Sequence, residues 1–168
     1  MGVLEHYIRD AVKAHPQVVG CEVFLTRAVI LRGQPDIQVR LSCKIDRLDL
    51  RQDGLLEALD YKTSADGNTL TRNDLARDIP IFLYYLVARL AYPQYADIAI
   101  SLLNLFSLQR VEAIYTDEER VQNKAQFTNI IYDLAAQRFD PHPGAHCRWC
   151  PVTDHCPGSA NAVSLDEI

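Results

Sequence analysis

The residues best suited to chemistry lie in the segment CKIDRLDLRQDGLLEALDYKT, at positions 43–63. Two acids, Asp46 and Asp60, stand in apolar runs on either side of an Asp-Gly pair, which is a strong hairpin signal. Side chains two residues apart on a strand share a face, so Asp60 and Lys62 point the same way, while Tyr61 points to the other face. A hairpin that folds back at this turn brings both carboxylates and the ammonium to one place.

This set of groups predicts hydrolysis of a phosphodiester. Two carboxylates with open water positions suit Mg²⁺ or Mn²⁺. A lysine beside such a metal can orient or deprotonate a water, or neutralise charge that develops on a phosphate. The alternative is a solvated hairpin face that carries charges without a function. The apolar neighbours of both acids disfavour it, because carboxylates in apolar strands cost free energy unless a metal or a lysine compensates.

Other motifs accompany this hairpin in a fixed order. They are GVLEH at Gly2–His6, CEVFL with Glu22, IDR with Asp46, LDYKT with Asp60 and Lys62, DIPIFLYY with Tyr84, and HCRWCPVTDHC near the C-terminus. The ordered set resembles the PD-(D/E)XK nuclease superfamily in its RecB-like branch, which includes bacterial recombination exonucleases and CRISPR-associated exonucleases. The resemblance extends from Gly2 to about Pro157.

The resemblance implies a metal-dependent deoxyribonuclease, and an exonuclease in particular, on a restriction-endonuclease-like α/β core with a mixed central sheet flanked by helices. It assigns the divalent metal to Asp46, Asp60 and the carbonyl of Tyr61. The histidine of the GxxxH motif, His6, is expected to complete the metal shell. DNA is the implied substrate, in recombination, repair or defence, with a helicase or another protein of these pathways as a possible partner.

The remaining site residues follow from the same resemblance. Lys62 is expected to position the water and stabilise the pentavalent phosphate, and Glu22 to orient Lys62 or the water. Tyr84 corresponds to the tyrosine of a QxxxY motif that contacts DNA or the catalytic lysine. The chain departs from the family pattern at Cys43, where a glycine is expected, and at Pro80, where the glutamine is expected.

These departures leave two alternatives open. One is a non-catalytic DNA-binding or scaffold module that keeps the nuclease fold. The other is a zinc-stabilised interaction domain whose acids have no catalytic role. The joint presence of Asp46, Asp60 and Lys62 argues against both, because neither needs the three groups together.

Three cysteines near the C-terminus form a second candidate site. Cys147, Cys150 and Cys156 lie within ten residues, interleaved with two histidines, at a spacing that lets thiolates reach one metal. Zinc would accept three cysteines and a histidine, whereas a [4Fe–4S] cluster prefers four thiolates. The RecB-like relatives with this pattern carry such a cluster, with their first cysteine upstream of the GxxxH helix. This chain begins at that helix, so Cys21 is the nearest substitute by family analogy.

Composition fits one domain with a substantial core. The chain has 168 residues, of which 48% are hydrophobic, and no apolar run is long enough to span a membrane. The N-terminus lacks a secretory signal pattern, which predicts a cytoplasmic protein and disfavours disulfides. The net charge of −5 argues against a large DNA-coating surface. Local positive charge near the hairpin is expected from five arginines, at positions 27, 32, 40, 47 and 51.

Periodicity and capping signals predict the elements in the order α-β-β-β-α-β-α. They give a helix at 3–14, strands at 18–31, 37–50 and 55–62, a helix from the Thr71 capping box to Tyr92, one or two strands at 97–115, a helix opened by the Thr116 capping box to about 138, and a Pro- and Cys-rich loop at 139–158. We expect a nuclease core at 1–140, a metal-binding loop at 141–158 and a frayed tail at 159–168. Pro80 should kink the second helix or mark its first turn, with Leu75, Ile79, Phe82, Leu83, Leu86 and Leu90 on its core face.

Overall fold

The computed structural model describes residues 5, 8, 9, 16–33, 35–63 and 70–158. The chain divides into two compact units, Met1–Thr128 and Asn129–Ile168. Most of the helix expected at 3–14 lies outside the described residues, and so do Gly2 and His6, although Glu5, Ile8 and Arg9 are helical. The tail expected at 159–168 also lies outside them.

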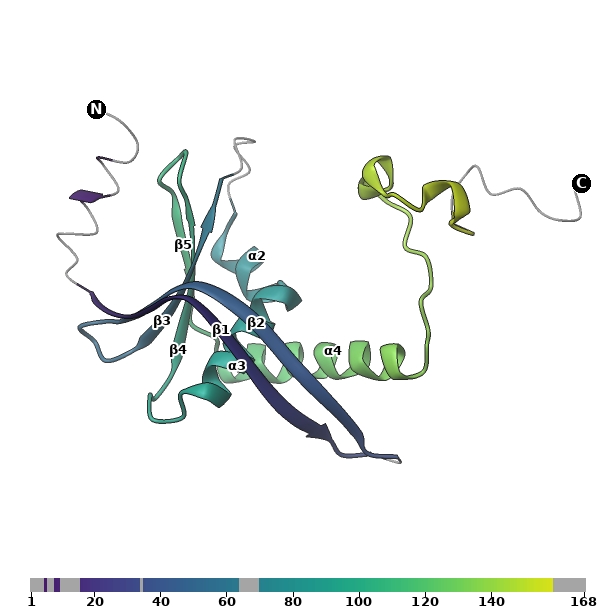
Figure 1. Ribbon diagram of the computed structural model, residues 1–168, viewed down its shortest axis with the longest axis horizontal. Coiled ribbons are helices and arrows are strands. Elements are labelled where there is room, and N and C mark those ends of the chain that lie inside the picture. Colours follow the sequence, from purple (N-terminus) through teal and green to yellow (C-terminus); the bar gives the residue numbers. More distant parts are fainter. Residues whose placement is uncertain (1–4, 6–7, 10–15, 34, 64–69, 159–168) are drawn as a thin grey trace, which may run out of the picture. The chain divides into compact units, whose positions relative to one another are not determined.

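The first unit is built on a five-stranded mixed sheet, which confirms the predicted fold class (Figure 1). The strands are β1 (Gln17–Leu31), β2 (Ile37–Leu50), β3 (Leu56–Lys62), β4 (Ile98–Asn104) and β5 (Arg110–Ala113), and their order in the sheet follows their order in the chain. Strands β3 and β4 pair in parallel, and the other neighbours are antiparallel. Within the described residues, this parallel pair is the one that needs a helical crossover, because parallel strands cannot be joined by a tight turn.

The crossover contains two helices, α2 (Arg72–Arg77) and α3 (Ile79–Ala91), where the sequence predicts one. The break lies at Asp78, whose extended backbone ends α2 and whose carboxylate accepts a hydrogen bond of 2.9 Å from the Ile81 N–H at the start of α3. Pro80 therefore occupies the first turn of α3, where a missing N–H costs nothing. Both predicted capping boxes are present, at Thr71 and at Thr116.

Helix α3 packs against β1, β2, β3 and β4 and supplies one side of the core. Its buried side chains are Ile81, Phe82, Tyr85, Val87 and Ala88. The predicted core face is wrong at Leu90, which is 47% exposed, and Leu83 and Leu86 are only partly buried. The reason is the break at Asp78: the helical phase restarts at Ile79, so a stripe extrapolated from Leu75 drifts off the buried face.

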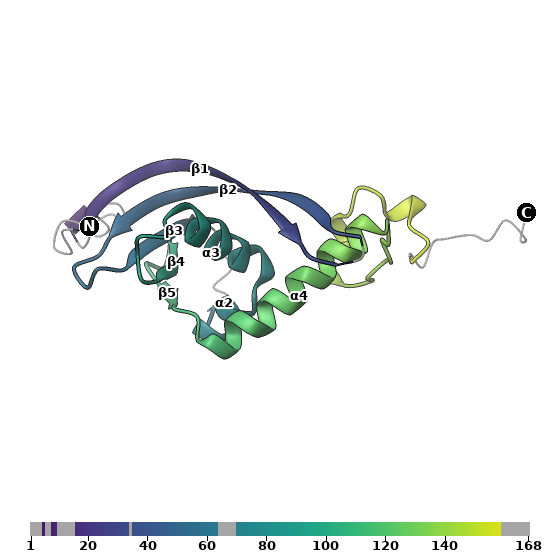
Figure 2. The ribbon, with the colours of Figure 1, turned by 90° about the horizontal axis from the view of Figure 1, so that it is seen from below.

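Strands β1 and β2 form a long curved ribbon, of which only one end joins the rest of the sheet (Figure 2). The ladder between β2 and β3 covers Arg47–Leu50 against Leu56–Leu59, whereas β3 stays paired with β4 as far as Lys62. Strands β2 and β3 thus diverge immediately beyond the Arg47–Leu59 pair. We call this place the fork.

The second unit contains the end of α4 (Asp117–Ala135), a helix that begins in the first unit and stops three residues before the predicted end. Two short 3₁₀ turns follow, η1 (Ala145–Trp149) and η2 (Thr153–His155), in the segment expected to be a loop. Among the described helices of both units, none combines the length and apolar character that a membrane crossing requires.

Candidate active site

The fork carries both acids of the predicted site. Asp46 and Asp60 are the first residues beyond the Arg47–Leu59 pair on β2 and β3. Because the strands separate here, the Tyr61 N–H does not continue the β2 ladder and instead donates a hydrogen bond of 2.8 Å to Asp46 Oδ2. The Asp46 carboxylate thus takes the place of a backbone acceptor, which fixes its position between the two strands.

Asp60 is a carboxylate in an apolar environment, with only 7% of the residue exposed. Its Oδ2 atom is buried and lies 2.6 Å from Lys62 Nζ, and it has no hydrogen bond of regular geometry to any described residue. The ion pair confirms that Asp60 and Lys62 share a face. A buried carboxylate oxygen with a single cationic neighbour has capacity for a further cation, which would offset the cost of its burial.

Lys62 is held in its charged form. Burial opposes the charge, but the close contact with the Asp60 carboxylate and its attraction, with a smaller contribution from Asp46, raise the pKa of Lys62 overall. Its side chain is 46% exposed, so the ammonium is also open to a substrate. An ammonium that stays protonated at neutral pH can stabilise negative charge and orient a water, and it is unsuited to removing a proton from one.

Tyr84, on α3, lies near the same charged groups. Burial raises the pKa of its phenol, and the negative charge of Asp60 acts in the same direction, while Lys62 opposes it. The neighbouring Tyr85 belongs to the core instead, with its ring centroid 4.8 Å from that of Tyr115. The thiol at the glycine position of the family, Cys43, is buried, and this burial raises its pKa to about 11.

Glu22 occupies the β1 position across from Asp46, between the pairs Cys21–Arg47 and Val23–Ile45. Its backbone has a φ of 54°, an unusual value within a strand. Its exposed carboxylate forms an ion pair with Lys44, and this contact raises the pKa of Lys44, with a smaller contribution from Asp46. The structure therefore aligns Glu22 with the acids across three strands, but the contact it gives Glu22 is to Lys44. Sequence reasoning missed this lysine, although it lies two residues before Asp46, as Lys62 lies two after Asp60.

Several arginines expected to supply positive charge are neutralised within the first unit. Arg47 pairs with Asp49 at 2.8 Å, Arg32 pairs with Asp36 at 2.6 Å, and Arg51 pairs with both Asp53 and Glu112. The Arg27 guanidinium donates to backbone carbonyls. The sequence count of cations near the hairpin thus overstates the positive charge available to a phosphate backbone.

The donor set at the fork fits Mg²⁺ or Mn²⁺. Such ions are commonly held by one or two carboxylates and keep several waters, and Asp46 and Asp60 supply the two carboxylates. Within the part of the chain that the structure describes, no three His, Cys, Asp or Glu side chains are grouped to hold a metal. A third protein ligand would therefore come from a carbonyl, as expected for Tyr61, or from His6, which lies outside the described residues.

In the second unit, the three cysteines line a single cavity of about 520 Å³, together with His142 and His146. Its wall is stabilised locally: Thr153 Oγ1 donates to the carbonyls of Cys147 at 2.9 Å and Cys150 at 2.8 Å. The cysteines nevertheless do not form a ligand group for a metal in the described residues. Trp149 is 77% exposed, so it does not cover the cavity, and Cys21 is an exposed residue of the first unit.

Comparisons with known proteins agree with this geometry. The family model described as the PD-(D/E)XK nuclease superfamily matches residues 2–157. The solved structure titled "Crystal structure of SSO0001" is similar over 96% of this chain and 69% of that chain, with a TM-score of 0.50 and 14% sequence identity, a likeness of fold. No curated protein matches the sequence. With Asp46, Asp60 and Lys62 together at the fork of a mixed sheet, this chain belongs to the PD-(D/E)XK nuclease superfamily.

Proposed function

We propose that this chain is a Mg²⁺- or Mn²⁺-dependent deoxyribonuclease of the RecB-like branch, which acts as an exonuclease in recombination, repair or defence. Membership of the nuclease superfamily supports phosphodiester hydrolysis. The observation that supports the proposal best is the fork, where a buried carboxylate, a second carboxylate fixed by a backbone N–H and a charged lysine converge. A scaffold would not need Asp60 Oδ2 to be buried without a regular hydrogen bond among the described residues.

The chemistry assigns a role to each residue at the fork. A divalent ion held by Asp46 and Asp60, with the Tyr61 carbonyl and His6 as further ligands, would polarise a phosphate oxygen and favour deprotonation of the attacking water. The attacking water loses a proton to solvent and its oxygen forms a bond to phosphorus. The bond from phosphorus to one ester oxygen breaks, and a proton from solvent reaches that departing oxygen. Lys62 stabilises the negative charge that develops on the phosphate, because its pKa is raised and its ammonium is partly exposed.

Two further residues have supporting roles in the proposal. Tyr84 contacts the DNA or Lys62, which is consistent with the influence of Asp60 and Lys62 on the pKa of its phenol. Glu22 orients a water near Asp46, supported by its place across from that acid. Its pair with Lys44 would have to yield to this role, and an exposed pair of this kind opposes it only weakly.

A cleavage assay of the purified chain tests the proposal. End-labelled single- and double-stranded DNA is incubated with Mg²⁺, with Mn²⁺ or with a chelator, and products are followed in time. We expect cleavage with either metal and none with the chelator. Asp60→Asn should lose both cleavage and calorimetric metal binding, whereas Asp140→Asn, an exposed acid of the second unit, should keep both. A chain that binds DNA but cleaves none under any metal would instead be a non-catalytic DNA-binding module.

The cysteine cavity supports a separate proposal, that Cys147, Cys150 and Cys156 bind a [4Fe–4S] cluster or Zn²⁺. The cluster would need a fourth thiolate beyond these three, and zinc would take a histidine of the same loop. Because these cysteines form no ligand group as they stand, binding would have to draw them together. Absorption spectra and elemental analysis of protein purified without oxygen distinguish a brown iron protein from a colourless protein with one zinc.

A further inference from the structure

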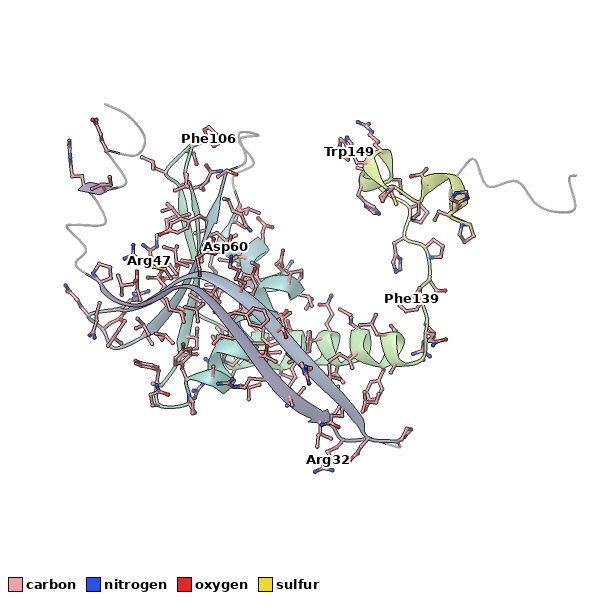
Figure 3. The ribbon with its side chains drawn as sticks, viewed as in Figure 1. Arg32, Arg47, Asp60, Phe106, Phe139 and Trp149 are labelled. Atoms are coloured by element: carbon pink, nitrogen blue, oxygen red, sulfur yellow. The ribbon has the colours of Figure 1, made fainter. Side chains whose placement is uncertain are left out.

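An exposed phenylalanine lies on the turn next to the strand that carries Asp60 and Lys62. Strands β3 and β4 run parallel and end together, with Lys62 paired to Asn104. The chain then turns through residues 105–107 before it returns as β5, and Phe106 lies in this turn. Figure 3 shows Phe106 at the tip of the β4–β5 turn, beyond Asp60 in the direction in which β3 runs.

The turn is fixed to the active-site strand by hydrogen bonds. The Leu105 N–H donates to the carbonyl of Lys62 at 2.8 Å. The side-chain oxygen of Asn104 accepts from the N–H groups of Phe106 at 2.8 Å and Ser107 at 3.0 Å, and the backbone N–H of Asn104 donates to the carbonyl of Gln109 at 2.9 Å. The position of Phe106 is therefore tied to the backbone of the proposed catalytic lysine.

The side chain of Phe106 is 60% exposed, in contrast to Phe82, which is 1% exposed in the core of the same unit. An aromatic ring held in solvent on a hydrogen-bonded turn adds nothing to core packing. It does offer a preorganised face, so that binding a flat partner would cost little conformational entropy. Bases of single-stranded DNA are such partners, because every base has a π-face.

Charge also favours stacking as a source of affinity for DNA. The chain has a net charge of −5, and Arg47 at the fork and Arg51 at the β2–β3 turn are paired with acids. Contacts between cations and phosphates therefore supply less of the binding free energy than in a basic DNA-binding protein. Aromatic stacking is largely independent of net charge, and it contributes to single-strand binding in many proteins.

We propose that Phe106 stacks on a base of single-stranded DNA close to the bond that is cleaved. Neighbouring strands lie about 4.8 Å apart and successive residues advance about 3.3 Å, so Phe106 lies within roughly 10 Å of Lys62, or about three stacked base steps. This inference rests on the proposed function, and it adds that the substrate has a single-stranded segment at the active site.

Binding to a fluorescent oligonucleotide tests the inference. The experiment uses the Lys62→Ala background with a chelator, so that the DNA stays intact, and the probe is a short single strand that contains 2-aminopurine. We expect Phe106→Ala and Phe106→Leu to weaken binding by about 5- to 100-fold and to change the 2-aminopurine signal, because both lack the π-face. Phe106→Trp should retain both properties. The matched control is Phe24→Ala, which removes a phenylalanine that is 69% exposed on β1 and should leave binding unchanged.

The outcomes separate this inference from the function on which it rests. Unchanged binding by Phe106→Leu, in a protein whose circular dichroism and melting temperature match those of the background, overturns the inference and leaves the nuclease in place. An equal loss in Phe24→Ala also overturns it, because the effect would then not be specific to the turn. If the wild-type chain neither cleaves nor binds DNA, the proposed function fails and the inference fails with it.

Discussion

The fork and the cysteine cavity are both candidate metal sites, but they are assembled in different ways. At the fork, strand pairing, a hydrogen bond from a backbone N–H and burial bring two acids and a lysine together. In the cysteine cavity, three thiols line one space on short 3₁₀ turns, yet they do not form a ligand group in the described residues. A site on strands can be preorganised by the fold, whereas a site on a loop with little burial depends on its ligand for order.

The largest effect is expected at the fork. Lys62→Ala should reduce the rate of DNA cleavage by about 10²- to 10³-fold, because it removes a charge that stabilises the transition state. The variant also leaves the buried Asp60 without its ammonium, so its melting temperature without metal should fall and Mg²⁺ should restore it. Gel-based cleavage kinetics and thermal melts measure the two effects.

Lys124→Ala is the control for this variant, because Lys124 is an exposed lysine of α4. It should match the parent in both measurements. Cleavage by Lys62→Ala at the parent rate would show that the preorganised fork does not carry the chemistry.

The cysteine cavity should respond to loss of a ligand in a different way. Cys150→Ser should weaken metal binding by more than about 100-fold, since changes in groups that only support a ligand already cost 10- to 100-fold. Trp149 is the single tryptophan of the chain and lies in η1, so its fluorescence should report metal-dependent order in this loop. Titration of the metal-free protein, followed by tryptophan fluorescence and elemental analysis, measures both.

Cys43→Ser is the matched control, because Cys43 is a buried strand thiol of the first unit. It should leave the metal-dependent change in Trp149 fluorescence intact. If Cys150→Ser binds as much metal as the parent and shows the same metal-dependent fluorescence change, Cys150 is not a metal ligand. The order of the loop would then not depend on metal binding by these cysteines.

A smaller effect is expected from Tyr84→Phe. Removing the phenolic hydroxyl should slow cleavage by about 2- to 10-fold, the range expected for one net hydrogen bond, without changing the fold. Tyr85→Phe provides the comparison from the adjacent residue, which is 5% exposed and packs against Phe82 and Tyr115. Steady-state kinetics should show a loss for the first variant alone. Equal rates for both would mean that Tyr84 only packs, and that Pro80 marks the loss of the QxxxY function.

The smallest effect concerns stability against acid in the first unit. The hydrogen bond from Arg72 outweighs burial and lowers the pKa of Glu119 to about 2. A carboxyl whose pKa is lowered in the folded state stabilises the fold above its unfolded pKa of 4.5, and this contribution disappears as the pH falls from about 4.5 to about 2. Glu119→Gln should therefore be less stable than the parent at neutral pH and lose less stability on acidification. Urea unfolding followed by circular dichroism across this range measures the difference, and Glu118→Gln should behave like the parent.

The sequence by itself determined which charged groups meet at the fork. Strand alternation placed Asp60 and Lys62 on one face, the Asp-Gly turn defined the hairpin that returns Asp46 toward them, and capping boxes set the starts of α2 and α4. These features are local, because each depends on residues close in the chain or on one short turn. The predicted order of helices and strands also suits the mixed sheet flanked by helices that the family resemblance implies.

The tertiary structure decided what depends on distant partners. The division of the helix at Asp78 places Tyr85 in the core and Tyr84 near the acids. The same division is why periodicity assigned Leu90 to the core face incorrectly. The pairing of Arg51 with Glu112, far along the chain, removed charge that the composition had suggested was free. Long-range contacts set both outcomes, because burial and ion pairing depend on which elements meet rather than on the local pattern. The sequence could place Asp46 and Asp60 near each other because a short turn joins their strands. The divergence of β2 and β3, which leaves the Tyr61 N–H to the Asp46 carboxylate, appears only in the tertiary structure.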